Sequence, residues 1–547
     1  MSGSSHRIKG LATKTTTENQ DYNIRKITVG EVDPTQPSKH GKVLMLLGAT
    51  GSGKSTLING FVNFIMGVQY KDKYRYKLIT DEGKKSQAHS QTSSITAYTF
   101  PKRKEHCGLP FTLTIIDTPG YGDTSGLDRD KQITKQIKEF FSLGGKQGID
   151  HLDGIGFVVQ SSLARLTPTQ KYIFDSILSI FGKDMGKNIF MMVTFADGKR
   201  PQILDAIKAQ GFEYQQVFKF NNSALLPDEG ADDDDDDSFN EMFWKMGEKS
   251  FQHFFKEFGK VRSVSLQLTK EVLKEREQLE CLIQGLQTQI QLGLSKVDQL
   301  HQEERIMKLH EKDIETNKDF TYEITETRQR KIDLPRGTHT TNCLRCNMTC
   351  HDDCAYADDA DKKDCCAMNS SGYCKVCPSG CYWNNHKNNP YRFELYEVQV
   401  TKTSDEIKKR YKEAESKKTQ KEEIMSGLTN ELEIMYYVVF SNISNARDSI
   451  ARLEEIALRP NPLSEVQYID LLIQSEEMEA KKGFTRRVQS LKEVRQQALV
   501  LTKIKDEKSF KEKCKAGAIH CWKSVTSYLI GSSFDGQKSE QSIARHI

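Results

Sequence analysis

The sequence lacks an apolar run of the roughly 18 residues that a helix needs to cross a bilayer, so we expect no transmembrane segment. The first residues lack the apolar core of a secretory signal, and Ser2 stands where myristoylation requires glycine. The last four residues lack a cysteine for prenylation. These absences predict a protein of the reducing cytoplasm.

An excess of charge of one sign is also missing. The chain has 79 Lys and Arg against 75 Asp and Glu, a net charge of +4. This balance gives no electrostatic footprint for nucleic acid, and we expect no direct nucleic-acid partner.

Hydrophobic residues make up 37% and charged residues 28% of the 547 residues, which excludes a polytopic membrane protein and a fully disordered chain. The length predicts about three or four units.

Residues 41–258 alternate short apolar runs with segments long enough for crossover helices. Short apolar runs bounded by turn signals are typical of buried parallel strands, which predicts a doubly wound α/β domain. The polar residues 1–40 are expected to form a flexible lead. Within the domain, residues 228–238 are expected to form an acidic loop. Its unbroken acidic run, 232–237, is either a solvated loop or a site for a metal or a basic partner.

The strongest motif is a phosphate-binding loop. The segment 48–55 reads Gly-Ala-Thr-Gly-Ser-Gly-Lys-Ser and matches G-x-x-x-x-G-K-[ST] at every defined position. It follows an apolar strand and opens a predicted helix. In this motif, backbone N–H groups surround phosphates, the lysine reaches the β- and γ-phosphates, and the last hydroxyl ligates magnesium. The predicted nucleotide-binding residues here are Gly48, Thr50, Gly51, Ser52, Gly53, Lys54, Ser55 and Thr56.

Two further segments supply groups for magnesium and the γ-phosphate. Asp117 ends a buried strand and is predicted to hold magnesium, and Gly120 is predicted to offer its N–H to the γ-phosphate. The hydroxyl-rich segment 90–96 lies between this turn and the phosphate loop. Thr92 is expected to close on the magnesium ion, with Thr96 as the alternative. Lys54 and Thr92 are therefore the expected catalytic residues, and Ser55, Thr92 and Asp117 the expected magnesium ligands.

A base-reading element is expected after a later strand. Asp197 follows the apolar run 189–194 and is placed to accept hydrogen bonds from guanine N1 and N2. Asn222, after the run 217–220, is a second candidate. The predicted ligands are GTP or GDP with Mg²⁺.

The order of these motifs resembles the septin-like branch of P-loop GTPases over about residues 40–258. The residues that carry the resemblance are 48–56, Thr92, 117–123 and 194–197. The segments 164–167 and 220–222 are similar to the AIG1-type subgroup, the immunity-associated and chloroplast-import GTPases. The resemblance implies a slowly hydrolysing GTP switch that forms homo-oligomers through its G domain.

Two departures from the family pattern keep other functions open. Phe195 replaces the lysine of the usual Thr/Asn-Lys-x-Asp motif, which motivates a P-loop ATPase or small-molecule kinase as an alternative. Tyr121 follows Gly120 where many GTPases have a water-positioning glutamine. That residue motivates the other alternative, a non-catalytic scaffold that binds nucleotide structurally.

The chain after residue 258 has a different character. Residues 259–320 and 402–458 each follow a heptad pattern of apolar residues and predict two coiled-coil helices. Between them, residues 321–401 form a Cys- and His-rich module flanked by strand-like stretches. This order predicts an antiparallel helical arm with the module at its tip. Residues 459–530 are expected to be helical and 531–547 disordered. The arm and the module are the expected docking sites for protein partners.

Nine of the thirteen cysteines lie between Cys343 and Cys381. Paired C-x2-C units with nearby histidines are typical of tetrahedral zinc sites, and the module has few aliphatic residues on which to fold. Structural zinc, disulfides and free thiols all remain open, as does the pairing. The four remaining cysteines, Cys107, Cys281, Cys514 and Cys521, are expected to be ordinary thiols. The predicted zinc ligands are Cys343, Cys346, Cys350, His351, Cys354, Cys374, Cys377, Cys381 and His386.

Overall fold

The chain divides into two compact units in the computed structural model. One unit contains Met1–Leu273 and Glu454–Arg495, and the other contains Lys274–Leu453 and Gln496–Ile547. The structure describes residues 7–19, 23–30, 41–79, 92–102, 109, 111–122, 127–143, 148–163, 165–225, 234–316, 321–403, 439, 441–459, 466–479 and 484–505.

An eight-stranded mixed sheet forms the centre of the first unit, in the order β11-β10-β9-β4-β7-β6-β3-β2. Its middle strands run parallel, as expected for strands that are buried on both faces. β6 is antiparallel to β7 and parallel to β3, so the sheet is mixed. These strands are β4 (Lys42–Gly48), β6 (Ile95–Phe100), β7 (Leu113–Asp117), β9 (Gly154–Gln160), β10 (Ile189–Thr194) and β11 (Gln216–Lys219).

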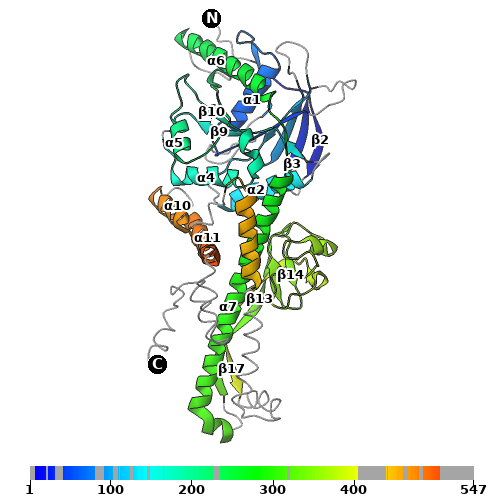
Figure 1. The fold of residues 1–547 in the computed structure, drawn as a ribbon, viewed down its shortest axis with the longest axis vertical. Helices are drawn as coiled ribbons and strands as arrows, with labels where there is room; N and C mark the ends of the chain where they lie inside the picture. The colour runs from blue at the N-terminus through cyan, green and yellow to red at the C-terminus, as the bar shows by residue number, and fades with distance from the viewer. Residues whose placement is uncertain are drawn as a thin grey trace. The chain divides into compact units, whose positions relative to one another are not determined.

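Helices cover both faces of this sheet (Figure 1). On one face, Phe61 of α1 contacts Phe251, Phe254 and Phe255 of α6, and Phe258 lies on the same side of that helix in the same core cluster. On the other face, Phe174 of α4 stacks on Phe157 of β9 at a centroid distance of 4.2 Å. The helices are α1 (Lys54–Ile65), α2 (Leu127–Ser142), α4 (Pro168–Leu178), α5 (Ile203–Ala209) and α6 (Asp234–Phe258).

The expectation of a flexible lead over residues 1–40 is wrong for the residues that the structure describes there. β2 (Thr13–Asn19) and β3 (Ile24–Val29) extend the main sheet, and β1 (Arg7–Lys9) pairs with β5 (Tyr74–Tyr76). The lead is polar, but its threonines are β-branched and therefore suit an edge strand. Ile24 and Val29 are buried. Residues 31–40 lie outside the described residues.

The acidic run is also partly helical, not a loop. α6 begins at Asp234, so the last four aspartates of the run form its first turn. The remaining acidic-loop positions, 228–233, lie outside the described residues.

Two helices near the C-terminus follow the main segment of the second unit. The first of them, and the second as far as Arg495, belong to the first unit. They are α10 (Val466–Glu479) and α11 (Phe484–Lys505), within the range predicted to be helical. α10 packs against α4. Among the described residues, no helix is both long and apolar enough to cross a membrane. The predicted disordered tail, 531–547, lies outside the described residues.

The second unit is organised along the 50-residue helix α7 (Gln267–Thr316), most of which belongs to it. A second helical segment covers residues 441–456, and Asn442 Nδ2 donates to Gln289 Oε1 of α7 at 3.3 Å. Most of the predicted second seam, residues 404–438, lies outside the described part of the chain. The continuous first helix is thus observed, and its coiled-coil pairing stays a prediction.

The sequence predicted that the cysteine-rich module lies at the far end of the helical arm. In the structure the module lies beside α7 instead. β13 (Thr321–Asp333) and β17 (Tyr391–Thr403) pair along their full length and run back beside α7. Thr325 N donates to Gln302 Oε1 at 2.9 Å, and Ser295 Oγ donates to Thr327 Oγ1 at 2.5 Å. A thirteen-residue strand rises about 3.3 Å per residue, so the ladder spans roughly 27 helical residues. Figure 1 shows the module, labelled β14, beside α7.

The module has little regular structure of its own. It contains only the short strands β14 (Thr341–Cys343), β15 (Met348–His351) and β16 (His386–Lys387). Its buried cluster consists mainly of cysteine side chains, with Met348, Ala367, Met368 and Val376. An apolar core this small cannot offset the entropy of ordering the chain, so another stabilising contribution is required.

Candidate functional site

The phosphate-binding loop connects β4 to α1. Gly51 and Gly53 have positive φ angles of 76° and 90°, a backbone conformation that side chains other than glycine rarely adopt. This conformation turns successive N–H groups toward one concavity, the arrangement that binds anions. The helix that begins at Lys54 adds a favourable dipole. Ser55 and Thr56 occupy its first turn.

Lys54 lies across this loop. Its Nζ donates to Gly48 O at 3.1 Å and to Ala49 O at 3.0 Å. Burial lowers the pKa of Lys54 to about 8, against the opposing charge of Asp117. A bound phosphate would supply the negative charge that this buried ammonium lacks.

Three buried oxygens around the loop form no hydrogen bond with the rest of the described protein. They are Thr50 Oγ1, Ser52 Oγ and Asp117 Oδ1. Buried polar atoms are nearly always paired, so such a group of orphans points to a polar ligand. The donor set therefore fits a triphosphate and a magnesium ion: inward N–H groups and an ammonium for phosphate, hydroxyl and carboxylate oxygens for the metal.

The structure brings Thr92 and Asp117, the two predicted magnesium ligands outside the phosphate loop, into contact. Thr92 Oγ1 donates to Asp117 Oδ2 at 3.4 Å. Burial raises the pKa of Asp117 to about 6, and the nearby Lys54 and Thr92 act in the opposite direction. The alternative Thr96 lies inside β6, where it is buried opposite Asp117 in the ladder and its Oγ1 is 3.3 Å from Ser94 Oγ.

The turn after Asp117 lies directly against the phosphate loop. Thr50 N donates to Tyr121 O at 3.0 Å, and Tyr121 N donates to Gly48 O at 3.2 Å. A Cβ on Gly120 would lie 2.6 Å from Thr50 Cα, so only glycine allows this approach. The Tyr121 side chain is buried, with its hydroxyl 3.2 Å from Thr134 Oγ1 of α2. Tyr121 therefore fixes the turn to the core of the unit.

The predicted base-reading segment adjoins the same loop. Thr194 Oγ1 donates to Ser52 O at 2.8 Å. Phe195 has a φ angle of 52° and is 58% exposed, an unusual conformation for a large side chain and one that is found mostly at functional sites. Asp197 is exposed, and its Oδ1 accepts from Lys199 N at 3.0 Å. Both side chains are thus accessible to a ligand beside the loop.

The structure places the two asparagines of the predicted second base element differently. Asn221 Nδ2 donates to Ala196 O at 3.0 Å and so supports the Phe195–Asp197 turn. Both asparagines line a cavity between α1 and α6, and Asn222 Oδ1 would be 2.8 Å from a Cβ at Gly60 of α1. Sequence reasoning selected Asn222 and missed Asn221, although the two are adjacent in the same motif.

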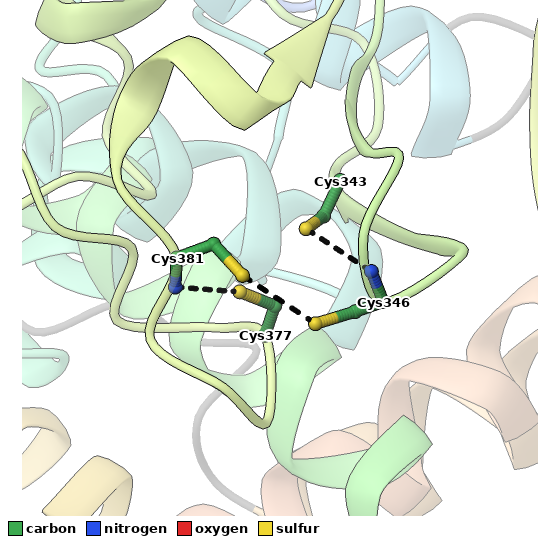
Figure 2. Close-up of side chains that lie close together, drawn as sticks. All are labelled: Cys343, Cys346, Cys377 and Cys381. Carbon is green, nitrogen blue, oxygen red and sulfur yellow. Dashed lines mark hydrogen bonds between the residues drawn. The ribbon is translucent and has the colours of Figure 1, made fainter.

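The cysteine module contains two groups of four potential metal ligands that share Cys377. One group is Cys343, Cys346, Cys377 and Cys381, and the other is Cys350, Cys374, Cys377 and His386. Figure 2 shows the first group converging, with Cys346 Sγ 3.7 Å from Cys381 Sγ. Two sulfurs on one tetrahedral zinc ion lie about 3.8 Å apart, so this spacing fits zinc.

Backbone N–H groups already point at these sulfurs. Cys346 N donates to Cys343 Sγ at 3.4 Å, and Cys381 N donates to Cys377 Sγ at 3.3 Å (Figure 2). Cys377 N also donates to Cys374 Sγ at 3.4 Å. Hydrogen bonds of this kind stabilise thiolates, the form of cysteine that binds metal.

His386 is oriented as a metal ligand. Its ring is buried, and Nδ1 lies 3.2 Å from Tyr382 O, a distance at which an N–H donates to the carbonyl. The other nitrogen, Nε2, is buried without a hydrogen-bond partner among the described residues. A metal-bound histidine commonly donates one N–H to a carbonyl and leaves the second nitrogen for the ion.

His351 and Cys354, also predicted as zinc ligands, belong to a different cluster. Both form a group of potential metal ligands with Cys365. His351 also belongs to a second group, with Cys366 and Cys281. Cys281 comes from α7, and its Sγ is 2.8 Å from Cys366 Sγ, so the expectation of an ordinary thiol without neighbours is wrong for this residue. Its place on a distant helix left no local spacing signal.

Comparison with known proteins places the resemblance in the first unit. Residues 41–142 match the family model for septins. Rat Septin-2 is 34% identical over 99 residues, which are 18% of this chain and 24% of that protein. Residues 41–142 are septin-like. They include the phosphate loop, Thr92 and the Asp117 turn but not Asp197, and the chain spans about a quarter of the length of the curated relative.

Some solved structures are also similar to part of this chain, at low sequence identity. Toc33 from Arabidopsis thaliana, solved with GDP and Mg²⁺, is 15% identical and covers 41% of this chain and 86% of its own, with a TM-score of 0.26. The signal recognition particle receptor complex SRb-GTP/SRX from Chaetomium thermophilum is also 15% identical. It covers 38% of this chain and 99% of the matched chain, with a TM-score of 0.23.

Proposed function

We propose that the first unit binds GTP with Mg²⁺ and hydrolyses it slowly, as a molecular switch. The observation that carries this proposal is the group of orphaned buried oxygens beside Lys54, which a nucleotide triphosphate and its metal would satisfy. The septin-like segment 41–142 supports the same function.

The residues of the site fall into groups that would bind phosphate and groups that would bind magnesium. Inward N–H groups of the loop and the Lys54 ammonium hold the phosphates. Ser55, Thr92 and Asp117 are the oxygen ligands that would hold magnesium, which supplies charge neutralisation at the transferred phosphate when bound. Gly120 lies against Thr50, where its backbone is close to the phosphate end of the site.

Guanine recognition is assigned to Asp197, with Phe195 beside it. An exposed carboxylate can accept two hydrogen bonds from guanine N1 and N2, whereas adenine has no such donor pair on its edge. The Phe195 ring replaces the lysine stem that covers the base in related GTPases, and a phenyl ring offers an apolar face for stacking.

Slow turnover follows from the position of Tyr121. Its buried ring occupies the sequence position from which a glutamine would orient the attacking water. We also propose that the chain forms homo-oligomers through this unit in the cytoplasm, as the septin-like resemblance implies. The same buried Tyr121 favours the second candidate, a scaffold that holds nucleotide without hydrolysing it.

The second unit is proposed to carry structural zinc. Each of the two groups supplies four ligands, and Cys377 belongs to both. Seven side chains can therefore complete two tetrahedral sites if the Cys377 sulfur bridges the two ions. Such closed sites would stabilise the module as a docking surface for protein partners. Disulfides, the alternative, are disfavoured in a reducing compartment.

Competition binding tests the nucleotide proposal. Fluorescent GTP bound to the full chain should be displaced by GTP and not by ATP, and Asp197→Ala should remove this preference. Lys199→Ala, a change at a neighbouring exposed residue, is the matched control. Equal displacement by both nucleotides would favour the ATPase alternative. Equal phosphate release by the wild type and Lys54→Ala would favour the scaffold.

A further inference from the structure

A third cluster of potential metal ligands lies in the second unit, apart from the seven residues assigned above. Its members are five buried or half-buried side chains in two overlapping triplets, Cys281–His351–Cys366 and His351–Cys354–Cys365. Within each triplet, the candidate ligand atoms all lie within 4.8 Å of one another. Thiolates with one imidazole are the donor set that zinc prefers.

The two triplets share His351, and two distances from its ring match ligands of one ion. His351 Nδ1 is 3.4 Å from Cys365 Sγ and 3.4 Å from Cys366 Sγ. A nitrogen and a sulfur on one tetrahedral zinc ion lie about 3.6 Å apart. Cys281 Sγ lies 2.8 Å from Cys366 Sγ. This is about 1 Å closer than two sulfurs on one zinc ion, so the two side chains would move apart slightly on binding.

Helix α7 is shaped to receive the module at this point. Cys281, Gly285 and Gln289 are spaced by four residues and therefore share one face of the helix. A Cβ at Gly285 would lie 2.5 Å from Val376 Cγ1, so the module approaches too closely for any larger residue. Gln289 Nε2 donates to the backbone oxygen of Val376. Glycine inside a helix costs about 1 kcal/mol, and this close approach accounts for its presence.

We propose that a third zinc ion binds this cluster and joins the module to helix α7. Cys281, His351 and Cys366 supply three ligands, and one of Cys354 and Cys365 supplies the fourth. The thiols lose their protons on binding, as zinc coordination requires. The metal thus closes a loop of 85 residues between Cys281 and Cys366 and holds the module on one face of the helix.

This inference rests on the proposed zinc chemistry of the module but uses none of the seven ligands of the other two sites. Zinc content of the full chain, purified in a reducing buffer without oxygen and measured by native mass spectrometry, therefore separates the two ideas. The wild type should hold three zinc ions and Cys281→Ser two, because a serine hydroxyl does not replace a thiolate ligand. Cys107→Ser, which removes a cysteine outside the cluster, should retain all three.

Two results would overturn the third site while leaving the other two intact. They are a wild type with two ions, and a Cys281→Ser variant that keeps the wild-type number. A wild type without zinc would overturn both this inference and the proposed zinc sites of the module.

A measurement on the wild type guards against misfolding of the variant. Cys281 and Cys366 should resist N-ethylmaleimide in the zinc-loaded protein and react after zinc is removed with a chelator, as peptide mapping would show. Rapid labelling of Cys281 in the zinc-loaded protein contradicts the site. A Cys281–Cys366 disulfide in protein isolated without oxidant contradicts it as well.

Discussion

The two units differ in the kind of side chain that they bury. The first unit buries a large aromatic and aliphatic core between a sheet and its helices, with Phe61 and the α6 phenylalanines at its centre. The cysteine module of the second unit buries mostly sulfur. Apolar burial stabilises a domain without any ligand, whereas a core of thiols becomes favourable only when a metal binds them. The comparison predicts that the first unit folds without the proposed nucleotide, whereas the module folds only with the proposed zinc.

Removal of zinc should have the largest effect. A structural zinc ion contributes about 10–16 kcal/mol in small zinc domains, far more than the few apolar residues of the module supply. A chelator should therefore expose residues 341–387 to protease while the first unit keeps its thermal transition. Re-addition of zinc serves as the control. Protection of the module that survives complete zinc removal would break the contrast between the units.

Phe61→Ala should destabilise the first unit by about 3–5 kcal/mol, because the large ring is fully buried among other aromatics. Denaturant unfolding followed by fluorescence measures the loss. The zinc content of the module should not change, which serves as the internal control. A loss below about 1 kcal/mol would mean that this aromatic cluster is not the main support of the unit.

Lys54→Ala should weaken GTP binding by about 2–5 kcal/mol, roughly 30-fold to several thousand-fold, since the change removes a buried charge that would pair with phosphate. Titration with fluorescent GTP measures the affinity. Lys199→Ala, at an exposed residue, should bind GTP like the wild type. Unchanged affinity of Lys54→Ala would contradict the assigned phosphate site.

Asp117→Asn should raise the stability of the nucleotide-free protein at neutral pH and abolish magnesium-dependent binding. Burial raises the pKa of Asp117 to about 6, from an ordinary value of 3.8, so the folded state holds the proton more tightly than the unfolded state. The stability of the wild type should accordingly fall as the pH rises from about 4 to 6, and the loss persists above 6. The gain in the variant should be about 1–3 kcal/mol at pH 7.

Denaturant unfolding of the wild type and the variant at pH 4 and pH 7 checks this sign. The difference between them should be small at pH 4, where both side chains are neutral. A variant that is less stable than the wild type at pH 7 without nucleotide would show that the buried carboxylate is compensated in the free protein.

Thr167→Ala should have the smallest effect, about 1 kcal/mol of stability in the first unit. Thr167 Oγ1 accepts from Gln170 N at 3.2 Å, and Gln170 Oε1 accepts from Thr167 N at 3.0 Å, a reciprocal cap at the start of α4. Thermal unfolding measures the change, and Thr167→Ser should retain most of the cap. An equal loss in both variants would assign the effect to packing instead of capping.

The same contrast explains what could be predicted from sequence. The phosphate loop is contiguous, and its glycines, lysine and flanking strand are all legible over a dozen residues. The proposed zinc ligands between Cys343 and His386 can be recognised as a set in the sequence because Cys pairs recur at short spacing. The sequence does not show how these residues are grouped. Two groups share Cys377, and His351 lies in a separate cluster with Cys366.

Other features depend on contacts between distant segments and left no local pattern. The role of Cys281 depends on a hairpin that folds back along α7, and nothing in the helix itself indicates that return. The strands of the lead were missed because their side chains are polar, although threonine favours extended backbone. Gly285 was interpreted as a weak point of a heptad seam, whereas the structure shows it as the position where Val376 approaches.

Native mass spectrometry of the freshly purified full chain tests the central contrast most directly, because one spectrum reports both ligands. The account predicts a guanine nucleotide in some molecules, removable without loss of zinc, and three zinc ions in all of them. A chain that carries adenine nucleotide and remains folded without zinc would contradict it.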